Sequence, residues 1–128
     1  MIRADRLKTL FLELVQIDSL SRREGRIAAH LAGLLRELGA EVEFDDAGTQ
    51  LGGETGNLIA HVPGTVDGSP LLLCAHMDTV EPGEGVRPVV EGDVIRTDGS
   101  TVLGGDDKSG VAIVCECLRV CREERLRH

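Results

Sequence analysis

One short run restricts the fold of this chain more than any other, the stretch LLLCAHMDTVEPG over residues 71–83. Its first five residues, Leu71 to Ala75, include no charged or strongly polar side chain, whereas a strand with one solvent-facing side alternates polar and apolar positions. The run therefore predicts a strand buried on both faces, as in a parallel sheet covered by helices. His76 and Asp78 follow it directly, at the C-terminal end of a strand, where open α/β sheets bind their ligands.

The segments around this run alternate between helical and strand-like patterns. Apolar residues recur at helical spacing in three of them, and Ser21 followed by Glu24 fits a capping box that opens the second helix, with Gly39 as its C-terminal cap. Helices are predicted over residues 3–17, 22–38 and 108–125, strands over 40–46, 57–62 and 70–76, and a short strand and turn over 92–100. The predicted fold class is α/β, with helices packed on a mostly parallel sheet.

The composition of the chain argues against some classes of binding partner and favours one cellular compartment. A formal net charge of −8 and only two aromatic residues disfavour a nucleic-acid partner, which needs positive charge and stacking surfaces. No apolar run approaches the roughly 18 residues of a membrane span, and the N-terminus lacks the apolar core of a secretion signal. The four cysteines lack zinc-ribbon spacing, which favours free thiols and a cytoplasmic location.

His76 and Asp78 form the first candidate for a chemical site. A neutral histidine is a common metal ligand, and a carboxylate two residues away can hold the other ring nitrogen in one tautomer. His76 is thus a candidate metal ligand and Asp78 the residue that orients it. Taken alone, the pair fits a surface or capping pair better than a metal site.

Asp106 is the second candidate, within the glycine-flanked stretch LGGDDKSG at the predicted start of the last helix. In such a turn an aspartate can present both carboxylate oxygens to two cations, so that Asp106 could bridge a binuclear site. The alternative is a helix N-cap at Asp106, with Asp107 as a first-turn residue that complements the helix dipole.

Other ligand-binding loops fit this stretch less well. A phosphate-binding loop needs Gly-Lys-Ser, but Lys108 follows an aspartate. An EF-hand loop needs acidic residues at alternating positions and a closing glutamate, which the stretch lacks. An acidic calcium-binding turn remains as the main alternative outside enzymes, and its acidic residues would be Asp93, Asp98, Asp106 and Asp107.

Together, the stretches TGNLIAHVPG, LLLCAHMDTVEPG and VIRTDGSTVLGGDDKSGVA resemble the peptidase T-like branch of the co-catalytic zinc metallopeptidases, the superfamily of carboxypeptidase G, aminoacylase and succinyl-diaminopimelate desuccinylase. The resemblance covers nearly all of the chain. It implies that His76 is a ligand of one zinc ion, that Asp106 bridges two zinc ions, and that Asp78 is the catalytic-site residue that orients His76. It also implies a cis peptide bond between Asp106 and Asp107.

The resemblance further implies a hydrolase that cleaves peptide bonds of short peptides, in the manner of a tripeptidase or aminopeptidase, with a water activated by two Zn²⁺ ions. An amidohydrolase of N-acyl amino acids and a non-catalytic metal-binding remnant are the alternatives. The family's Glu-Glu pair, its later ligands and its lid and dimerisation domain have no counterpart in this sequence. Residues 1–128 are therefore expected to be the N-terminal part of a zinc-exopeptidase catalytic domain, inactive alone, whose full-length parent is a candidate homodimer.

Several other polar residues are expected to lie outside the site. The spacing of Glu116, Glu123 and Glu124 suits an exposed charged face of the last helix. His30 and His61 are expected to have structural or exposed positions.

Overall fold

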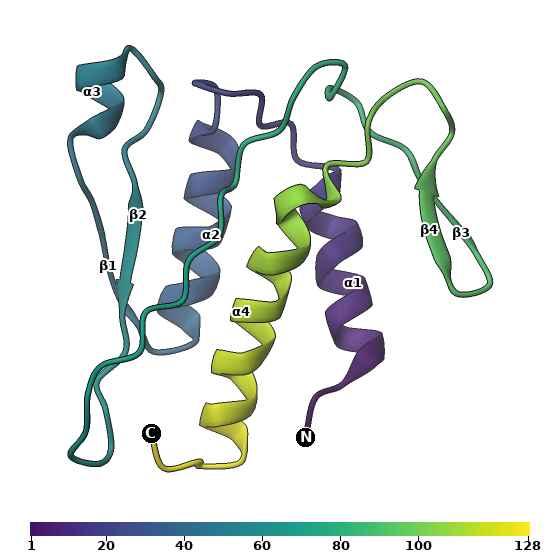
Figure 1. Cartoon of the computed structure of the whole chain (residues 1–128). Helices are drawn as coiled ribbons and strands as arrows, with labels where there is room; N and C mark the ends of the chain where they lie inside the picture. The colour runs from purple at the N-terminus through teal and green to yellow at the C-terminus, as the bar shows by residue number, and fades with distance from the viewer.

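The computed structural model describes residues 1–128, which form three long helices flanked by two small strand pairs (Figure 1). One strand pair and the short helix α3 lie beside α2, and the other pair lies at the opposite side of the molecule, beyond α1 (Figure 1). In chain order the elements are α1 (Ala4–Val15), α2 (Gly25–Glu37), β1 (Glu41–Phe44), α3 (Ala47–Leu51), β2 (Leu58–His61), β3 (Pro88–Glu91), β4 (Val94–Thr97) and α4 (Gly105–Glu123).

The core forms where the apolar stripes of the three long helices meet, which confirms the three helices predicted from periodicity. Leu14 and Ile27, from α1 and α2, are completely buried there together with Ala112 of α4. The end of α2 also follows the prediction: Gly39 has a positive φ of 94°, and the N–H groups of Gly39 and Ala40 bond back to the last turn of the helix.

The prediction of a mostly parallel sheet is wrong for this chain. β1 pairs antiparallel with β2, and β3 pairs antiparallel with β4, so each sheet has two antiparallel strands. A parallel sheet requires strands that lie far apart in sequence to meet through crossover connections, which a local apolar pattern does not specify. The architecture is mixed α/β, and the only parallel pairing is an isolated bridge between Leu20 and Thr79.

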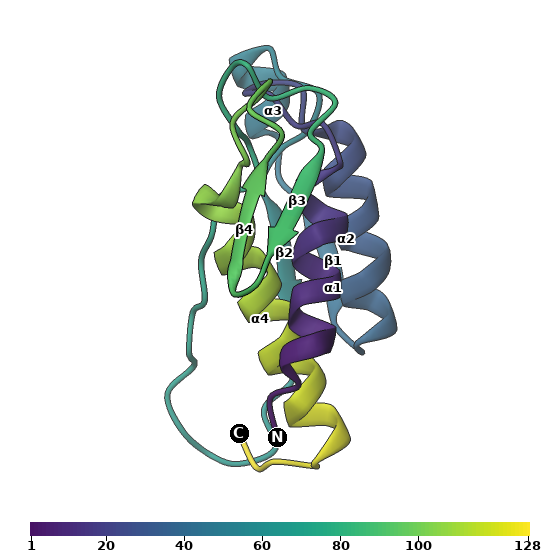
Figure 2. The same ribbon diagram turned by 90° about the vertical axis from the view of Figure 1, so that its right-hand side faces the viewer.

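The apolar run from Leu71 to Ala75 is not a buried strand, contrary to the prediction. It belongs to no strand, and Leu71 and Leu72 are 83% and 87% exposed. Figure 2 shows the chain after β2 bowing away from α4 before it returns toward the start of that helix. A strand is defined by hydrogen bonds to neighbours, and none of the other strands pairs with this run.

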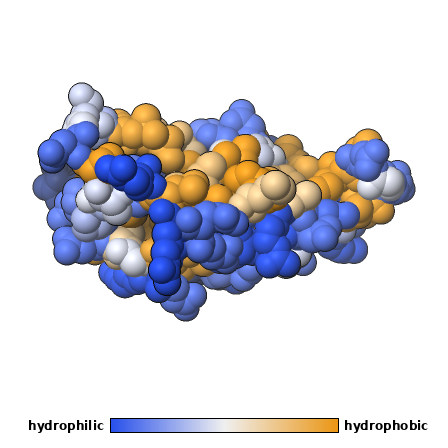
Figure 3. Space-filling view, turned by 90° about the horizontal axis from the view of Figure 1, so that it is seen from below, coloured by the Kyte–Doolittle hydropathy of each residue, from blue (hydrophilic) through white to orange (hydrophobic).

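The molecule also exposes apolar residues over a wider surface. Seen from the end at which both termini lie, apolar residues form a band along one side of the molecule, while polar residues cover the other side (Figure 3). The large apolar side chains left exposed elsewhere include Val66, Ile59 of β2 and Ile113 of α4. No helix is both long and apolar enough to cross a membrane.

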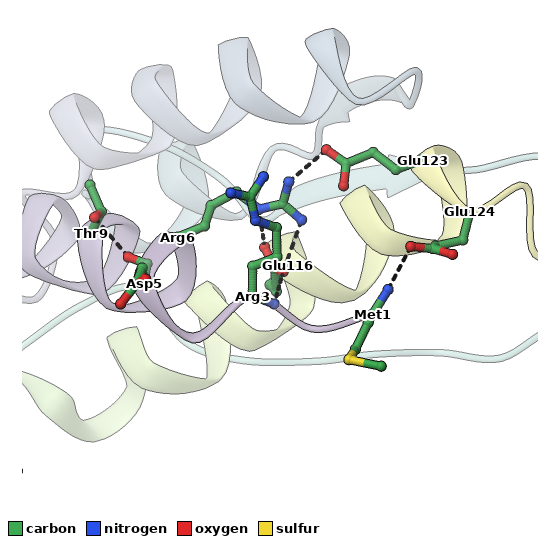
Figure 4. Close-up of polar contacts among 8 residues, drawn as sticks. All are labelled: Met1, Arg3, Asp5, Arg6, Thr9, Glu116, Glu123 and Glu124. Carbon is green, nitrogen blue, oxygen red and sulfur yellow. Dashed lines mark hydrogen bonds and ion pairs between the residues drawn. The ribbon is translucent and has the colours of Figure 1, made fainter.

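An ion pair between Arg6 and the buried carboxylate of Glu116 joins α1 to α4 (Figure 4). Nε and Nη2 of Arg6 donate to the two carboxylate oxygens of Glu116 at 2.7 and 2.9 Å, and the backbone N–H of Arg3 donates to the same carboxylate at 2.9 Å. Glu116 is 2% exposed, so its predicted place on an exposed face is wrong. Glu123 and Glu124 do lie on the surface, where they pair with Arg6 and the N-terminal ammonium.

Candidate metal site

His76, Asp78 and Asp106 come together at the end of the molecule where α4 begins. Nδ1 of His76 lies 3.0 Å from Oδ1 of Asp78, and Nε2 lies 3.1 Å from Oδ1 of Asp106. The imidazole therefore stands between a carboxylate two residues away and one thirty residues away. This is the juxtaposition expected from the sequence, while the metal-binding role of the three residues stays a prediction.

The chemistry of these donors fits a cation between His76 and Asp106. A carboxylate only accepts hydrogen bonds, so the proton of a neutral imidazole belongs on Nδ1, facing Asp78. The lone pair of Nε2 then faces an oxygen of Asp106, and only a second proton or a metal ion makes that contact favourable. Two donors at about 2.0–2.1 Å from a tetrahedral zinc lie about 3.3 Å apart, close to the 3.1 Å found here.

The acid–base properties of His76 agree with this arrangement. Partial burial lowers the pKa of His76, but hydrogen bonds to Asp106 and to the backbone and side chain of Asp78 outweigh that effect and raise the pKa above its ordinary value. A site that attracts a proton to Nε2 in this way also attracts a metal cation, which competes with the proton for the same lone pair.

Asp106 is available for ligation because its neighbour caps the helix. Oδ1 of Asp107 accepts a hydrogen bond from the N–H of Gly110 at 3.0 Å, the contact of an N-cap, and the backbone of Asp106 and Asp107 is not helical. The regular part of α4 therefore starts at Lys108, as predicted. The residue that caps the helix is therefore Asp107 and not Asp106, the alternative considered from the sequence. The side chain of Asp106 is 96% exposed.

The backbone around Asp106 is fixed by its surroundings. Gly104 has a φ of 72°, and a Cβ on it would lie 2.8 Å from Cγ2 of Thr79, so only glycine fits between the two site segments. The peptide bond between Asp106 and Asp107 is cis, as the resemblance predicts.

Lys108 connects the start of α4 to the end of α1. Its side chain is 1% exposed, and Nζ donates to the backbone carbonyl of Ile17, just after α1, at 2.7 Å. Burial lowers the pKa of Lys108 to about 8, against a smaller opposing effect of Asp18. The contact ties the segment that carries Asp106 to the first helix.

Sequence reasoning missed Ser21 and misassigned its function. The predicted capping box is absent: the N-cap position of α2 is Glu24, and no side chain caps the helix there. The hydroxyl of Ser21 instead donates to Oδ2 of Asp78 at 2.5 Å. The spacing between Ser21 and Glu24 fits a local cap equally well, and no pattern around Ser21 indicates this long-range contact.

The remaining candidates lie elsewhere. Asp98 is engaged by Ser100 and Arg87, and the acidic residues of the proposed calcium-binding turn do not form a site. His61 is exposed at the end of β2, and His30 lies near Glu13 on the helical surface. No group of three or more His, Cys, Asp or Glu side chains is arranged to hold a metal ion, so His76 and Asp106 are an incomplete set.

The fold of the chain is similar to segments of solved peptidase structures. The chain superposes with a TM-score of 0.96 and 40% identity on a tripeptidase from Staphylococcus aureus, matching 100% of this chain and 35% of that one. It superposes with a TM-score of 0.91 and 40% identity on the aminopeptidase PepT from Bacillus cereus, matching 99% of this chain and 34% of that one. The chain belongs to the peptidase T-like metallopeptidase family.

Curated relatives agree with this membership. The peptidase T-like chain is 44% identical over its full length to the protein YqjE of Bacillus subtilis, of which it covers 34%. Over 88% of its length it is 30% identical to peptidase T of Shewanella woodyi, covering 36% of that protein, and 36% identical to succinyl-diaminopimelate desuccinylase of a Methylobacterium species, covering 28%. No family model matches the chain. The chain spans about a third of the length of these curated relatives.

Proposed function

We propose that residues 1–128 are the N-terminal part of the catalytic domain of a cytoplasmic metallopeptidase that hydrolyses short peptides. One observation carries this proposal: His76 converges on Asp106 at 3.1 Å, with Asp78 on the opposite ring nitrogen, in a chain with the fold of a tripeptidase segment. The free state of all four cysteines supports a reducing compartment.

In this proposal His76 and Asp106 hold zinc, and Asp78 keeps the proton of His76 on Nδ1 so that Nε2 remains a ligand. A carboxylate as exposed as that of Asp106 has one oxygen free for a second cation. Zinc bound there would activate a water molecule for attack on an amide carbonyl. His76 and Asp106 fill only two of the four positions that zinc takes in proteins, and neither is a general base. The remaining groups belong, in this proposal, to the rest of the parent protein.

A related amidohydrolase activity on N-acyl amino acids is the second candidate. The desuccinylase among the relatives supports it, since that enzyme's name describes removal of a succinyl group from an amino acid. The two candidates share the metal site and differ in substrate, so a tripeptide and an N-succinyl amino acid distinguish them.

The experiment compares two polypeptides with added Zn²⁺: residues 1–128, and a chain extended to the length of the relatives through the expected Glu-Glu region. We expect tripeptide hydrolysis from the extended chain only. In that chain, His76→Ala and Asp106→Ala should abolish hydrolysis, whereas His61→Ala, at an exposed histidine outside the site, should retain it. Equal zinc-dependent activity from monomeric residues 1–128, or full activity in His76→Ala, would contradict the proposal.

A further inference from the structure

The loop between α1 and α2 reaches into the candidate metal site through a single side chain. We propose that Ser21 is a positioning residue of this site: its hydroxyl holds the carboxylate of Asp78, which in turn holds the imidazole of His76 with Nε2 toward Asp106. Because it deepens the metal site proposed above, this inference depends on that site being real. It assigns a function in metal binding to a residue that touches neither His76 nor Asp106.

The backbone places Ser21 beside Asp78 with little freedom. Residues 19–21 and Thr79 form the isolated parallel bridge of the structure: the N–H of Thr79 donates to the carbonyl of Ser19 at 2.8 Å, and the N–H of Ser21 donates to the carbonyl of Thr79 at 3.3 Å. Leu20 and Thr79 are buried, which protects this bridge from water. Ser21 is thus fixed opposite the residue that follows Asp78.

The loop is also held on its far side. Arg22 has a φ of 72°, an unfavourable value for a residue with a side chain, and its carbonyl accepts a hydrogen bond from the N–H of Glu54 at 3.0 Å. Because Arg22 has a conformation that its own backbone disfavours, tertiary contacts and not the local sequence determine the conformation of this loop. The position of the Ser21 hydroxyl is therefore a property of the folded chain.

The hydroxyl of Ser21 does not cap α2. The N–H of Gly25, in the first turn, bonds to Oε2 of Glu54 at 3.1 Å, and Glu24 bonds to the N–H of Arg22. Ser21 makes its side-chain hydrogen bond to Asp78 instead, at 2.5 Å. Removing the hydroxyl should therefore disturb the metal site and leave the helix intact.

Asp78 uses its two carboxylate oxygens for two different partners. Oδ1 faces Nδ1 of His76 at 3.0 Å, and Oδ2 accepts from Ser21. Without the hydroxyl the carboxylate can rotate about its Cβ–Cγ bond and release the imidazole. The backbone carbonyl of Asp78, 3.2 Å from Nδ1, offers a substitute acceptor, so the effect should be a weaker site and not a lost one. Removal of a residue that orients a metal ligand lowers metal affinity roughly 10- to 100-fold.

The test measures the dissociation constant of Zn²⁺ by isothermal titration calorimetry on the 128-residue chain at fixed neutral pH. Ser21→Ala should raise the dissociation constant roughly tenfold, and Ser21→Thr, which keeps the hydroxyl, should restore it to within about twofold. Ser100→Ala is the matched control, because Ser100 forms an equivalent exposed serine–aspartate contact with Asp98 outside the site and should leave zinc binding unchanged. Thermal unfolding without zinc should be the same for all four proteins.

The outcomes separate this inference from the proposed function. Loss of zinc binding in His76→Ala together with wild-type affinity in Ser21→Ala would leave the metal site in place and overturn the assignment of Ser21. Equal weakening in Ser21→Ala and Ser21→Thr would also overturn it, since packing of the loop and not the hydroxyl would then be responsible. Zinc binding that survives His76→Ala unchanged would overturn the proposed site and this inference with it.

Discussion

Substitution of Glu116, whose carboxylate is buried between α1 and α4, tests how much the ion pair stabilises the contact between these helices. It accepts one hydrogen bond from the backbone of Arg3 and two from the guanidinium of Arg6. Glu116→Gln preserves the volume and one carbonyl acceptor but removes the charge and turns an NH₂ group toward donors. Hydrogen bonds to charged groups contribute about 1.5–3 kcal/mol, against about 0.5–1.5 kcal/mol for neutral ones, so two weakened bonds should lower the free energy of unfolding by about 2–3 kcal/mol.

Urea unfolding followed by far-ultraviolet circular dichroism measures this loss, because the chain has no Trp or Tyr for fluorescence. Glu124→Gln is the matched control: the same substitution at the end of the same helix, in a side chain that is 54% exposed and pairs with the N-terminal ammonium. Exposed ion pairs contribute about 0–1 kcal/mol, so the control should lose less than about 1 kcal/mol. Equal losses from the two variants would refute the reasoning that burial determines the contribution of Glu116.

The carboxylate of Glu116 should also make the stability of the fold depend on pH. The hydrogen bonds from Arg6 hold the pKa of Glu116 below its ordinary value. For an acid whose folded pKa is depressed, the stabilisation is complete above the unfolded pKa, about 4.3, and is lost as pH falls through the folded pKa. The wild type should therefore lose stability below about pH 4.3 more steeply than Glu116→Gln. Parallel urea midpoints of the two proteins from pH 6 to pH 3 would contradict this expectation.

Three further outcomes follow from the structure. Zinc at ten times its dissociation constant should stabilise the wild type by about 1.4 kcal/mol and Asp106→Asn by much less, measured as a shift in urea midpoint. The exposed apolar side chains should cause the wild type to self-associate, and Leu71→Lys, at an 83% exposed position, should reduce this self-association in sedimentation velocity without changing the circular dichroism spectrum. Gly104→Ala should cost about 1–3 kcal/mol more than Gly52→Ala, since both have positive φ but only Gly104 would bring a Cβ against Thr79; equal thermal unfolding shifts would argue against that clash.

The helices could be predicted and the sheet could not, for one physical reason. Helical hydrogen bonds and the burial of one helix face depend on residues three and four apart, so the periodicity around Leu14 and Ile27 is sufficient evidence. Strand pairing depends on a partner that the local sequence does not contain. The run from Leu71 to Ala75 has the composition of a buried strand, and its partner is absent from the strands of this chain.

The same distinction applies to polar residues. His76 and Asp78 lie two positions apart in sequence, so their contact is local, whereas Ser21 reaches Asp78 across 57 positions of sequence. Glu116 differs from the predicted exposed position for another reason. The residues four positions before and after it, Ala112 and Val120, are both buried, so helical periodicity already placed Glu116 on the inner stripe of α4. A charged residue at such a position indicates a buried ion pair with a basic residue of another helix, here Arg6 of α1.

Two features of the chain are incomplete: the exposed apolar run lacks a covering strand, and the candidate metal site lacks ligands. They lie next to each other, because the run from Leu71 to Ala75 leads directly into His76. Burying a leucine side chain contributes about 1.5–3 kcal/mol, so Leu71 and Leu72 together leave about 3–6 kcal/mol of potential stabilisation unused. A strand paired beside this run would restrain the backbone that carries His76, and elements packed on both of its faces would bury the two leucines, since successive side chains of a strand point to opposite faces. Zinc affinity and coverage of the run should therefore rise together in the extended polypeptide, since a ligand on a fixed strand loses less conformational entropy when it binds a metal than the same ligand on an unpaired segment.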